Sequence, residues 1–381
     1  MKIAVPAESA EAESRVAATP ETVKRLIALG AEIVVQAGAG EGSRYPDADY
    51  QTAGAKVLKT ANAVTKDADI VLRVRRPTPA ELHGVKAGAL AIALMDPYGH
   101  EAEIAALGEA GVRAFAMELM PRITRAQVMD VLSSQASLAG YQAVIDAAEA
   151  YDRAFPMMMT AAGTVPAAKV FVMGAGVAGL QAIATARRLG ASVTATDVRP
   201  AAKEQVESLG AKFIAVEDEE FKQAETTAGY AKPMSAEYQA KQAELTASHI
   251  AKQDIVITTA LIPGRPAPRL VSKAMLDSMK PGSVVVDLAV ERGGNVEGAV
   301  AGEIVAVGPA TIVGRLNVAG RIPATASSLY ARNLYAFVET LIDKEAKVVA
   351  LNYEDDLVKA TLLTNDGAVV HPMFAKKEGA A

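Results

Sequence analysis

Cysteine and tryptophan are absent from this 381-residue chain, and histidine occurs only 4 times. Without cysteine the chain forms no disulfide, presents no thiolate nucleophile and holds no zinc or iron–sulfur centre through sulfur. The histidines lie far apart in the sequence, so none has the spacing of a metal-ligand pair or of a catalytic dyad. They are His83, His100, His249 and His371. We therefore expect no metal site.

An excess of charge of one sign is also lacking, because 39 Lys and Arg face 44 Asp and Glu, for a formal net charge of −5. This balance provides no basic surface for a phosphate backbone, so we expect no nucleic-acid partner. No apolar run reaches the roughly 18–20 residues that span a bilayer. Residues 1–6 lack the apolar centre of a signal peptide. We expect a cytoplasmic chain that reaches a membrane only through partners.

Short β-rich runs alternate with helical patterns along the whole chain, which is typical of parallel strands joined by helical crossovers. Because single cores stop growing near roughly 250–300 residues, the length predicts two domains. The expected strands are 2–5, 32–36, 68–74, 89–95, 113–116, 169–173, 191–196, 212–216, 254–259, 283–288 and 311–313. The expected helices are 21–29, 125–152, 177–189, 201–209 and 324–342. The fold class is therefore α/β.

A glycine-rich segment, GAGVAG, follows the apolar strand 169–173 and opens a helix. In a dinucleotide-binding turn the first glycine makes the tight bend, the second admits the pyrophosphate and the third packs helix on strand. The pyrophosphate then faces the free N–H groups of the helix. The residues predicted to bind a cofactor here are Gly174, Gly176, Val177, Ala178 and Gly179.

Asp197 ends the next predicted strand, where a carboxylate accepts hydrogen bonds from the adenosine ribose. The same carboxylate repels a 2′-phosphate, so the sequence favours NAD(H) over NADP(H). Arg199 is the one complication, since an arginine could pair with that phosphate. We prefer a role in which it stacks on the adenine or points to solvent.

A polar cluster lies at the start of the predicted helix 125–152, where Gln127, Asp130 and Ser134 would share one face. Its members are Arg122, Arg125, Gln127, Asp130, Ser133 and Ser134. A solvated helix face and a site for the reacting end of a dinucleotide both fit this pattern. The methionines at 157–159 are interpreted as core packing. No general acid or base emerges from the motifs.

Several segments together make the chain resemble the NAD(H)-binding subunits of the proton-translocating nicotinamide nucleotide transhydrogenase family. They are ELMPRI at 118–123, RAQ at 125–127, SSQ at 133–135, LAGY at 138–141, 155–166, the glycine turn, ATDVR at 195–199, 203–210, 258–264 and 286–294. The likeness covers nearly the whole chain. It implies two Rossmann-like doubly wound parallel-sheet domains joined by long helices. Residues 1–133 with 325–381 would form the first domain, and 134–324 the second, with a mobile loop near 220–240.

Alanine dehydrogenases share this fold and a similar start around Arg15, but they use a lysine and a histidine to hold and protonate the substrate. At the lysine position, residues 71–76, only arginines occur as basic residues, and residues 93–96 contain no histidine. Reduction of a keto acid to an amino acid needs proton transfer by positioned groups, whereas direct hydride transfer between two nicotinamides does not. The sequence therefore favours a transhydrogenase.

The resemblance also assigns roles to particular residues. It implies that Arg122, Gln127, Asp130 and Ser133 hold the nicotinamide and its ribose, with Asp130 fixing Arg122. Asp197, Val198 and Arg199 would surround the adenosine, Ala260 and Leu261 would line the pocket, and Tyr230 would lie at the tip of the mobile loop.

The function implied is Re/Si-specific hydride transfer between NADH and NADP⁺, coupled to proton movement elsewhere. The partners implied are a second copy of the chain, an NADP(H)-binding subunit and a membrane-spanning subunit, on the cytoplasmic face of the inner membrane. Two alternatives remain open, an amino-acid dehydrogenase of the alanine dehydrogenase type and a non-catalytic NADH-binding protein.

Overall fold

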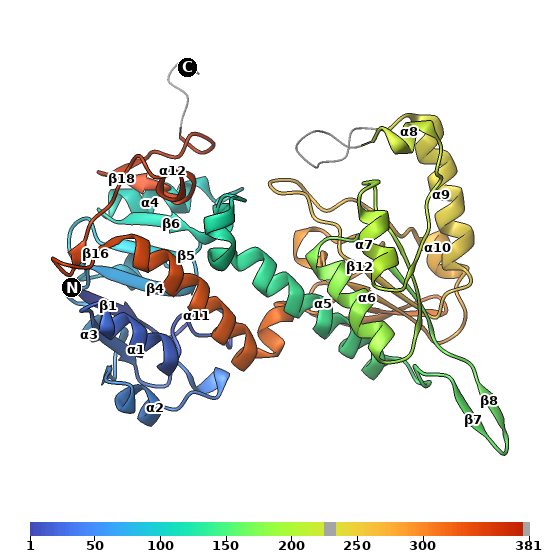
Figure 1. Ribbon diagram of the computed structural model, residues 1–381, viewed down its shortest axis with the longest axis horizontal. Helices are drawn as coiled ribbons and strands as arrows, with labels where there is room; N and C mark the ends of the chain where they lie inside the picture. Colours follow the sequence, from blue (N-terminus) through green and yellow to red (C-terminus); the bar gives the residue numbers. More distant parts are fainter. Residues whose placement is uncertain (225–233, 376–381) are drawn as a thin grey trace. The chain divides into compact units, whose positions relative to one another are not determined.

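The computed structural model describes residues 1–224 and 234–375, and the chain divides into two compact units (Figure 1). The first unit contains Met1–Gln135 and Ala319–Ala381, and the second contains Ala136–Val318. Each unit has its own largely parallel sheet and its own hydrophobic core. The predicted fold class, α/β with two doubly wound sheets, is confirmed. Among the described residues, no helix is long and apolar enough to cross a membrane.

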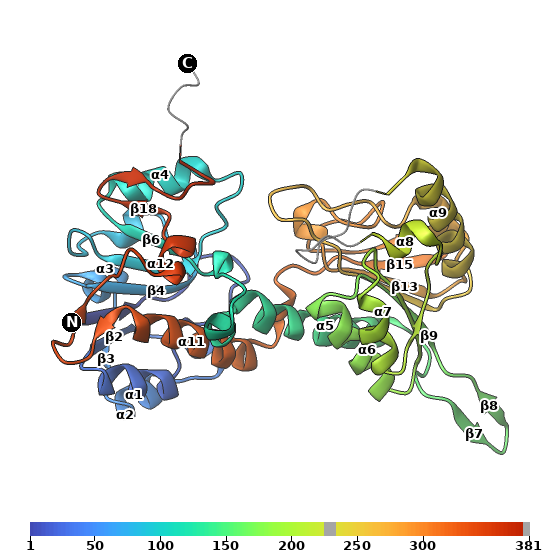
Figure 2. The ribbon, with the colours of Figure 1, turned by 45° about the horizontal axis from the view of Figure 1, so that its top comes forward.

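The first sheet has six parallel strands in the order β3-β2-β1-β4-β5-β6. Their bounds are β1 Lys2–Val5, β2 Glu32–Gln36, β3 Lys56–Leu58, β4 Ile70–Arg75, β5 Leu90–Leu94 and β6 Arg113–Ala116. Alternate side chains of a strand face opposite sides, so Ile3 and Val5 pack into one core layer and Ala4 into the other. The sheet is therefore covered on both faces (Figure 2).

Helices from both ends of the sequence supply these layers. The helix α11 (Pro323–Thr340) places Tyr330, Leu334 and Phe337, all fully buried, in the same core as Leu26 of α1 (Pro20–Ala28). Val64 of α3 (Ala61–Thr65) and Ile104 of α4 (Glu101–Glu109) pack in the other layer. Smaller elements are α2 Asp47–Thr52, α12 Asp356–Thr361, β16 Ile342–Asp343, β17 Val348–Val349, β18 Thr364–Asn365 and β19 Ala368–Val369.

The second sheet has the order β11-β10-β9-β12-β13-β15-β14, in which only β14 runs antiparallel to its neighbour. The strands are β9 Lys169–Met173, β10 Ser192–Thr196, β11 Lys212–Phe213, β12 Ile255–Thr258, β13 Ser283–Asp287, β14 Ile304–Val307 and β15 Ala310–Val313. The helices are α6 Val177–Arg188, α7 Ala202–Ser208, α8 Glu219–Lys222, α9 Ala236–Ile250 and α10 Lys273–Asp277. In both sheets the strand order reverses beside the first strand, and ligands of such folds bind outside the carboxyl ends of the strands at that point.

The predicted continuous helix 125–152 is wrong in its first turn. Thr124–Met129 forms a 3-10 helix, Asp130 adopts an extended conformation with ψ 91°, and the α-helix α5 runs only over Val131–Ala150. The reason is local, because the Asp130 carboxylate accepts a hydrogen bond from the Ser133 backbone N–H at 2.8 Å and so caps the new helix. Gln127 therefore does not share a helical face with Asp130 and Ser134.

The interpretation of the methionines at 157–159 as core residues is also wrong. They begin a two-stranded hairpin, β7 (Met158–Thr160) paired with β8 (Gly163–Val165), labelled at the edge of the second unit in Figure 1. Met157 is 62% exposed, Met158 42% and Met159 80%. The long polar interval after residue 216, in turn, contains the helix α9 rather than a loop alone.

Candidate functional site

The glycine turn joins β9 to α6 at the carboxyl edge of the second sheet. Gly174 has φ +106°, and a Cβ there would lie 2.5 Å from the Thr259 hydroxyl oxygen. A Cβ on Gly179 would lie 1.8 Å from the Gly174 carbonyl oxygen. A side chain on Gly179 would force backbone to move, and at Gly174 the positive φ disfavours any side chain, so both glycines are required for this turn to close.

Gly176 differs from these two glycines, because it precedes the first turn of α6 with an ordinary φ of −76°. A Cβ built there would meet no atom within 4 Å, and α6 has no side-chain cap. The first N–H groups of a helix lack partners within the helix, and they carry the positive end of its dipole. The open space in front of Gly176 therefore fits an anionic group such as a pyrophosphate.

Asp197 follows β10 at the same edge of the sheet, and its carboxylate is fixed from two sides. One oxygen accepts a hydrogen bond from the Ala175 backbone N–H at 2.8 Å, and the other accepts from the Arg199 backbone N–H at 2.9 Å. The Arg199 guanidinium forms a bidentate pair with the same carboxylate, at 2.9 and 3.0 Å. The Arg199 side chain therefore pairs with Asp197 and does not simply point to solvent, while Val198 is 63% exposed.

Ala260 and Leu261 lie on the loop that follows β12, again at the carboxyl edge. The Thr259 hydroxyl donates to the Gly174 carbonyl oxygen at 3.1 Å, which ties this loop to the glycine turn. Leu261 is 54% exposed. The structure thus brings the glycine turn, Asp197 and the 260–261 loop to one edge of the second sheet, since their strands are parallel neighbours.

Gly140 supports the glycine turn through a close helix contact, and it lies in one of the family-like segments. A Cβ on Gly140 of α5 would lie 2.0 Å from the carbonyl oxygen of Ala178, in the first turn of α6. The two helices therefore touch backbone to backbone beside the glycine turn. A glycine inside a long predicted helix was the one available signal.

The residues expected at the nicotinamide end belong to the first unit. Arg122 and Gln127 are exposed, and their side chains form no hydrogen bond or ion pair within residues 1–224 and 234–375. Asp130 does not hold Arg122, contrary to the expected role. Its carboxylate instead accepts two hydrogen bonds from Ser133, from the backbone N–H at 2.8 Å and from the hydroxyl at 2.5 Å.

Other members of the polar cluster fasten this segment to the C-terminal part of the chain. Arg125 forms a bidentate ion pair with Asp355 at 2.6 and 3.0 Å. The Ser134 hydroxyl donates to the Asn333 side chain at 2.7 Å, and Asn333 donates to the Val128 carbonyl oxygen at 2.7 Å. Asn333 was missed, because a polar residue within a helical pattern is normally assigned to the solvent-facing side. Of the six residues of the polar cluster, Arg122 and Gln127 are thus the two whose side chains have no such contact in the described part of the chain.

A buried ion cluster fills the carboxyl edge of the first sheet, where the strand order reverses. Glu13 pairs with Arg15 at 2.7 Å and with Arg75 at 2.8 Å, and its side chain is 1% exposed. Burial alone would raise the pKa of Glu13, but the hydrogen bonds and positive charge of Arg15 and then Arg75 lower it to about 2. The acid is therefore ionised and bound by the protein's own cations.

The remaining arginines of β4 and its end are also used internally. Arg73 pairs with Glu8 at 3.3 Å and with Glu81 at 3.0 Å, and burial raises the pKa of Glu8. Arg76 donates to the carbonyl oxygens of Met95 and Asp96. At this edge of the first sheet these side chains hold loops together rather than offering a proton donor for a substrate.

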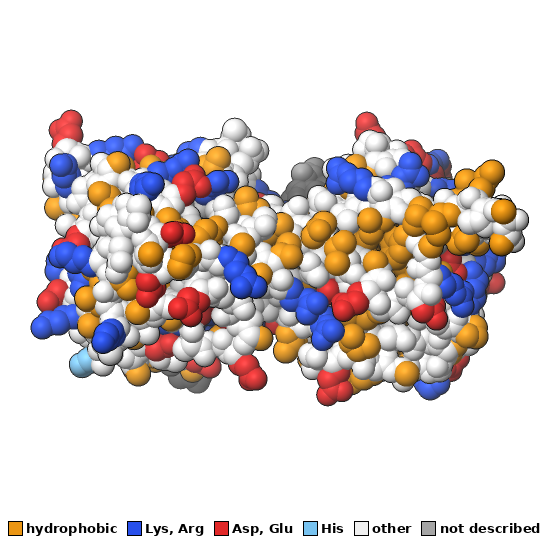
Figure 3. All heavy atoms as spheres, turned by 90° about the horizontal axis from the view of Figure 1, so that it is seen from below, with side chains coloured by type: hydrophobic (Ala, Val, Ile, Leu, Met, Phe, Trp, Pro, Cys, Tyr) orange, Lys and Arg blue, Asp and Glu red, His pale blue; other side chains and the backbone are white. Residues whose placement is uncertain are grey.

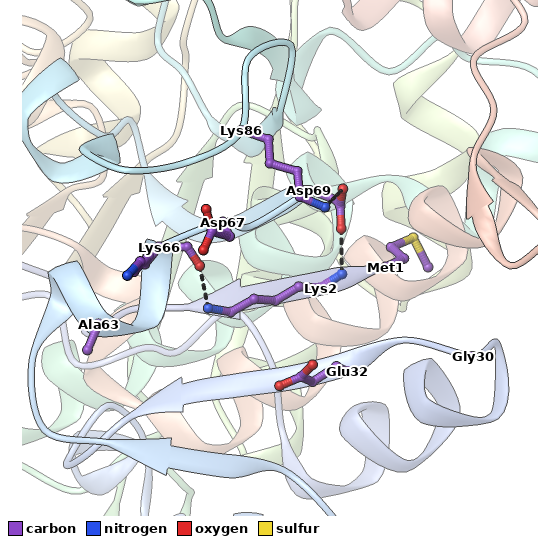
Figure 4. A pocket seen from close by; sticks show the side chains of 9 residues that line it. All are labelled: Met1, Lys2, Gly30, Glu32, Ala63, Lys66, Asp67, Asp69 and Lys86. Atoms are coloured by element: carbon purple, nitrogen blue, oxygen red, sulfur yellow. Dashed lines mark hydrogen bonds and ion pairs between the residues drawn. The ribbon is translucent and has the colours of Figure 1, made fainter.

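Tyr230, expected at the tip of the mobile loop, lies outside the described residues. The cavity shown in Figure 4, with a volume of about 580 Å³, lies at the amino end of β1, at the edge opposite to the carboxyl ends. Asp69 in its wall already accepts hydrogen bonds from the Lys2 backbone N–H at 2.6 Å and from the Lys86 ammonium at 2.7 Å. This cavity is therefore not the candidate site.

Comparison with known proteins gives concordant relatives. The chain matches the family described as alanine dehydrogenase/PNT, with the N-terminal domain over residues 4–139 and the C-terminal domain over residues 143–372. It is 52% identical over 377 residues to the first part of the NAD(P) transhydrogenase subunit alpha of Rhodospirillum rubrum, covering 98% of each chain. A solved transhydrogenase from Sinorhizobium meliloti superposes with a TM-score of 0.89 at 66% identity, covering 97% of this chain and 100% of that one. A solved L-alanine dehydrogenase superposes with a TM-score of 0.82 at 25% identity, covering 98% of both chains.

Proposed function

Because the chain belongs to the alanine dehydrogenase/PNT family, we propose that it is the NAD(H)-binding alpha subunit of a proton-translocating NAD(P) transhydrogenase. In this function hydride passes between NADH bound here and NADP⁺ held on a partner domain. The observation that carries NAD(H) binding is the open space before Gly176, at the uncapped start of α6 and beside the fixed carboxylate of Asp197. When bound, NADH supplies the hydride.

The chain's own residues act by binding and orienting. The N–H groups at the start of α6 receive the pyrophosphate, and Asp197 accepts hydrogen bonds from the adenosine ribose, beside Val198 and Arg199. Arg122 and Gln127 present polar groups to the nicotinamide, and Asp130 and Ser133 fix the turn that carries them. Hydride transfer requires the two reacting carbons to approach to about 3–3.5 Å, so positioning is the main contribution asked of these residues.

The alternative of an alanine dehydrogenase is disfavoured by the first unit. Residues 71–76 contain no lysine and residues 93–96 no histidine. Of the arginines that stand at the lysine position, Arg73 and Arg75 are engaged with Glu8, Glu13 and Glu81, and Arg76 with backbone carbonyl oxygens. A keto acid would therefore find no free proton donor among these described residues.

The proposal extends to the assembly. Two copies of the chain pair, and an NADP(H)-binding subunit and a membrane-spanning subunit complete the enzyme on the cytoplasmic face of the inner membrane. The subunit name of the Rhodospirillum rubrum relative supports the existence of further subunits. The exposed apolar hairpin at 157–165 supports pairing of two copies, because an isolated two-stranded hairpin is only marginally stable in water.

The test mixes the purified chain with an NADP(H)-binding transhydrogenase domain and follows reduction of an NAD analogue by NADH. We expect turnover that depends on the partner and on NADP(H). Oxidation of alanine by the chain alone with NAD⁺ would instead support the dehydrogenase. Binding of NADH without transfer to any acceptor would support a non-catalytic role.

Arg122→Ala and Gln127→Ala should lower hydride transfer far more than nucleotide binding. Equal losses of transfer and binding would contradict the placement of these two residues at the nicotinamide.

A further inference from the structure

The loop after β12 combines exposed apolar side chains with a backbone that is held in place. Leu261 is 54% exposed and Ile262 is 46% exposed. Exposed apolar residues on a short connection usually belong to a mobile segment, because little burial stabilises them. Here, however, the loop backbone is bonded at both ends by a buried polar side chain.

Asn295 provides the larger part of this support. Its side chain is fully buried, and its amide oxygen accepts a hydrogen bond from the Ala260 backbone N–H at 3.1 Å. Its amide nitrogen donates to the carbonyl oxygens of Ala260 at 2.9 Å and Pro268 at 2.8 Å. One side chain therefore closes both ends of the loop 260–268.

The turn that carries Asn295 is itself fixed by Asp287, the last residue of β13. The Asp287 carboxylate, 1% exposed, accepts hydrogen bonds from the backbone N–H groups of Ala289 at 2.9 Å and Val296 at 3.0 Å. The Asn295 carbonyl oxygen accepts from the backbone N–H groups of Leu270 at 2.8 Å and Val271 at 3.0 Å. The position of the Asn295 side chain is thus determined from β13 rather than from the loop it holds.

We propose that Asn295 is a positioning residue for nucleotide binding, which holds the backbone at Ala260 so that Ala260 and Leu261 are already in place when NAD(H) arrives. This inference rests on the proposed function. The physical basis of this role is that the loop loses its conformational entropy when the chain folds, so nucleotide binding does not have to order it. Without the amide, the N–H of Ala260 and two carbonyl groups lose their partners, and the loop must be ordered by the nucleotide itself.

The test compares Asn295→Ala with Asp254→Ala, a matched control in the same unit. Asp254 is 8% exposed and accepts from the Lys169 backbone N–H at 2.8 Å, but it lies at the amino edge of the sheet. Both variants should lower the Tm. Only Asn295→Ala should weaken NADH binding, measured by fluorescence titration, by about tenfold, the size of one or two lost buried hydrogen bonds.

A second pair of variants, which keep the side-chain volume, tests the same role in case Asn295→Ala does not fold. Asn295→Asp keeps the side-chain volume and the acceptor for Ala260 but places a carboxylate oxygen against the carbonyl oxygens of Ala260 and Pro268, so its NADH affinity should fall at least as far as that of Asn295→Ala. Asp254→Asn is its control and should bind as wild type. In transhydrogenation assays the Asn295 variants should raise the KM for NADH with little change in kcat, whereas a merely structural defect lowers kcat with the amount of folded enzyme.

Wild-type affinity in a folded Asn295 variant, or an equal loss in the Asp254 control, would overturn the role of Asn295. Failure of the proposed function appears differently, because then the wild-type chain itself shows no NADH binding or no partner-dependent transfer.

Discussion

Gly176 leaves the start of α6 open although its own conformation tolerates a side chain. Gly176→Ala should therefore fold with an unchanged Tm but place a methyl group where the pyrophosphate approaches the backbone. We expect NADH affinity to fall by about tenfold or more, about 1.4 kcal/mol, in a nucleotide titration. Gly174→Ala is the contrasting variant and should lose stability as well, because its φ of +106° disfavours any side chain. Unchanged NADH binding by Gly176→Ala would remove the glycine turn from the site.

The pairing of Arg199 with Asp197 gives a prediction about the preference between NADH and NADPH. Asp197→Ala removes the charge that repels a 2′-phosphate and frees the Arg199 guanidinium to bind it. Affinity for NADPH should rise while affinity for NADH falls, and their ratio should change by roughly tenfold or more, about 1.4 kcal/mol. Parallel titrations with both nucleotides measure the change. The double variant Asp197→Ala/Arg199→Ala should lose the gain for NADPH, and retention of the gain would show that Arg199 does not bind the phosphate.

Glu13 makes the stability of the first unit depend on acid pH. Its pKa is about 2 in the folded chain against an ordinary value of 4.5, so its contribution is fully present above pH 4.5. The contribution is lost as the pH falls towards 2. Glu13→Gln should lower the free energy of unfolding at pH 7, by about 3–5 kcal/mol for a broken buried pair. In this variant the free energy of unfolding, measured by urea unfolding, should also change less between pH 4.5 and 2 than in the wild type. Glu237→Gln, at an exposed position, is the control. If the free energy of unfolding of Glu13→Gln and of the wild type varied with pH in parallel, Glu13 would not be the group responsible.

At the scale of elements, strands were predictable where their burial is continuous. The apolar runs of β1, β2 and β9 predict strands whose side chains are buried on both faces of a sheet. The predicted bounds of these strands agree with the structure. The start of α5 was predicted wrongly because the periodic pattern depends only on apolar positions. The actual start is determined by the Asp130 carboxylate, which accepts a hydrogen bond from the Ser133 N–H. The exposed hairpin could not be predicted, because apolar composition alone does not reveal whether a partner or the core covers it.

Within the site, residue type and order predicted the glycine turn and Asp197, since their chemistry is local. The bonds from Asn295 to Ala260 and from Asn333 to Val128 join residues far apart in the sequence. No periodicity carries that information, so these supports needed the structure.

The contact between α5 and α6 predicts that a glycine-to-alanine substitution within a helix lowers the stability instead of raising it. Glycine to alanine inside a helix normally stabilises by about 1 kcal/mol. Gly140→Ala should instead destabilise by about 1–3 kcal/mol, because the new methyl group overlaps the Ala178 carbonyl and backbone must move. NADH affinity should fall with it, since Ala178 lies in the first turn of α6. Thermal unfolding and titration check both effects, with Gly176→Ala, the same substitution in open space, as the control for the Tm. A raised Tm for Gly140→Ala would contradict the close contact.

At the scale of the whole molecule, the hairpin 157–165 is the feature that favours a second copy. Hydrophobic side chains gather on the face of the second unit shown in Figure 3, and Met157, Met158 and Met159 are all exposed in the single chain. Met158→Ser with Met159→Ser should weaken the proposed dimer by roughly a hundredfold or more, because each of the two buried methionines contributes about 1.5–3 kcal/mol. Sedimentation velocity over a range of concentrations measures this. Met373→Ser, an equally exposed methionine of the first unit, should leave the dimer intact, and a monomeric wild type would refute the pairing.

The first unit is built from two separated stretches of sequence, 1–135 and 319–381, with the second unit inserted between them. On the ribosome the first sheet is synthesised first, yet Tyr330, Leu334 and Phe337 of its core emerge only after the entire second unit. Domains normally become compact in the order in which they are made. Here that order is inverted, because the core of the first unit lacks these side chains until the whole second unit has been synthesised. We therefore expect a nascent chain of this design to need protection of residues 1–135 for as long as the second unit takes to be translated.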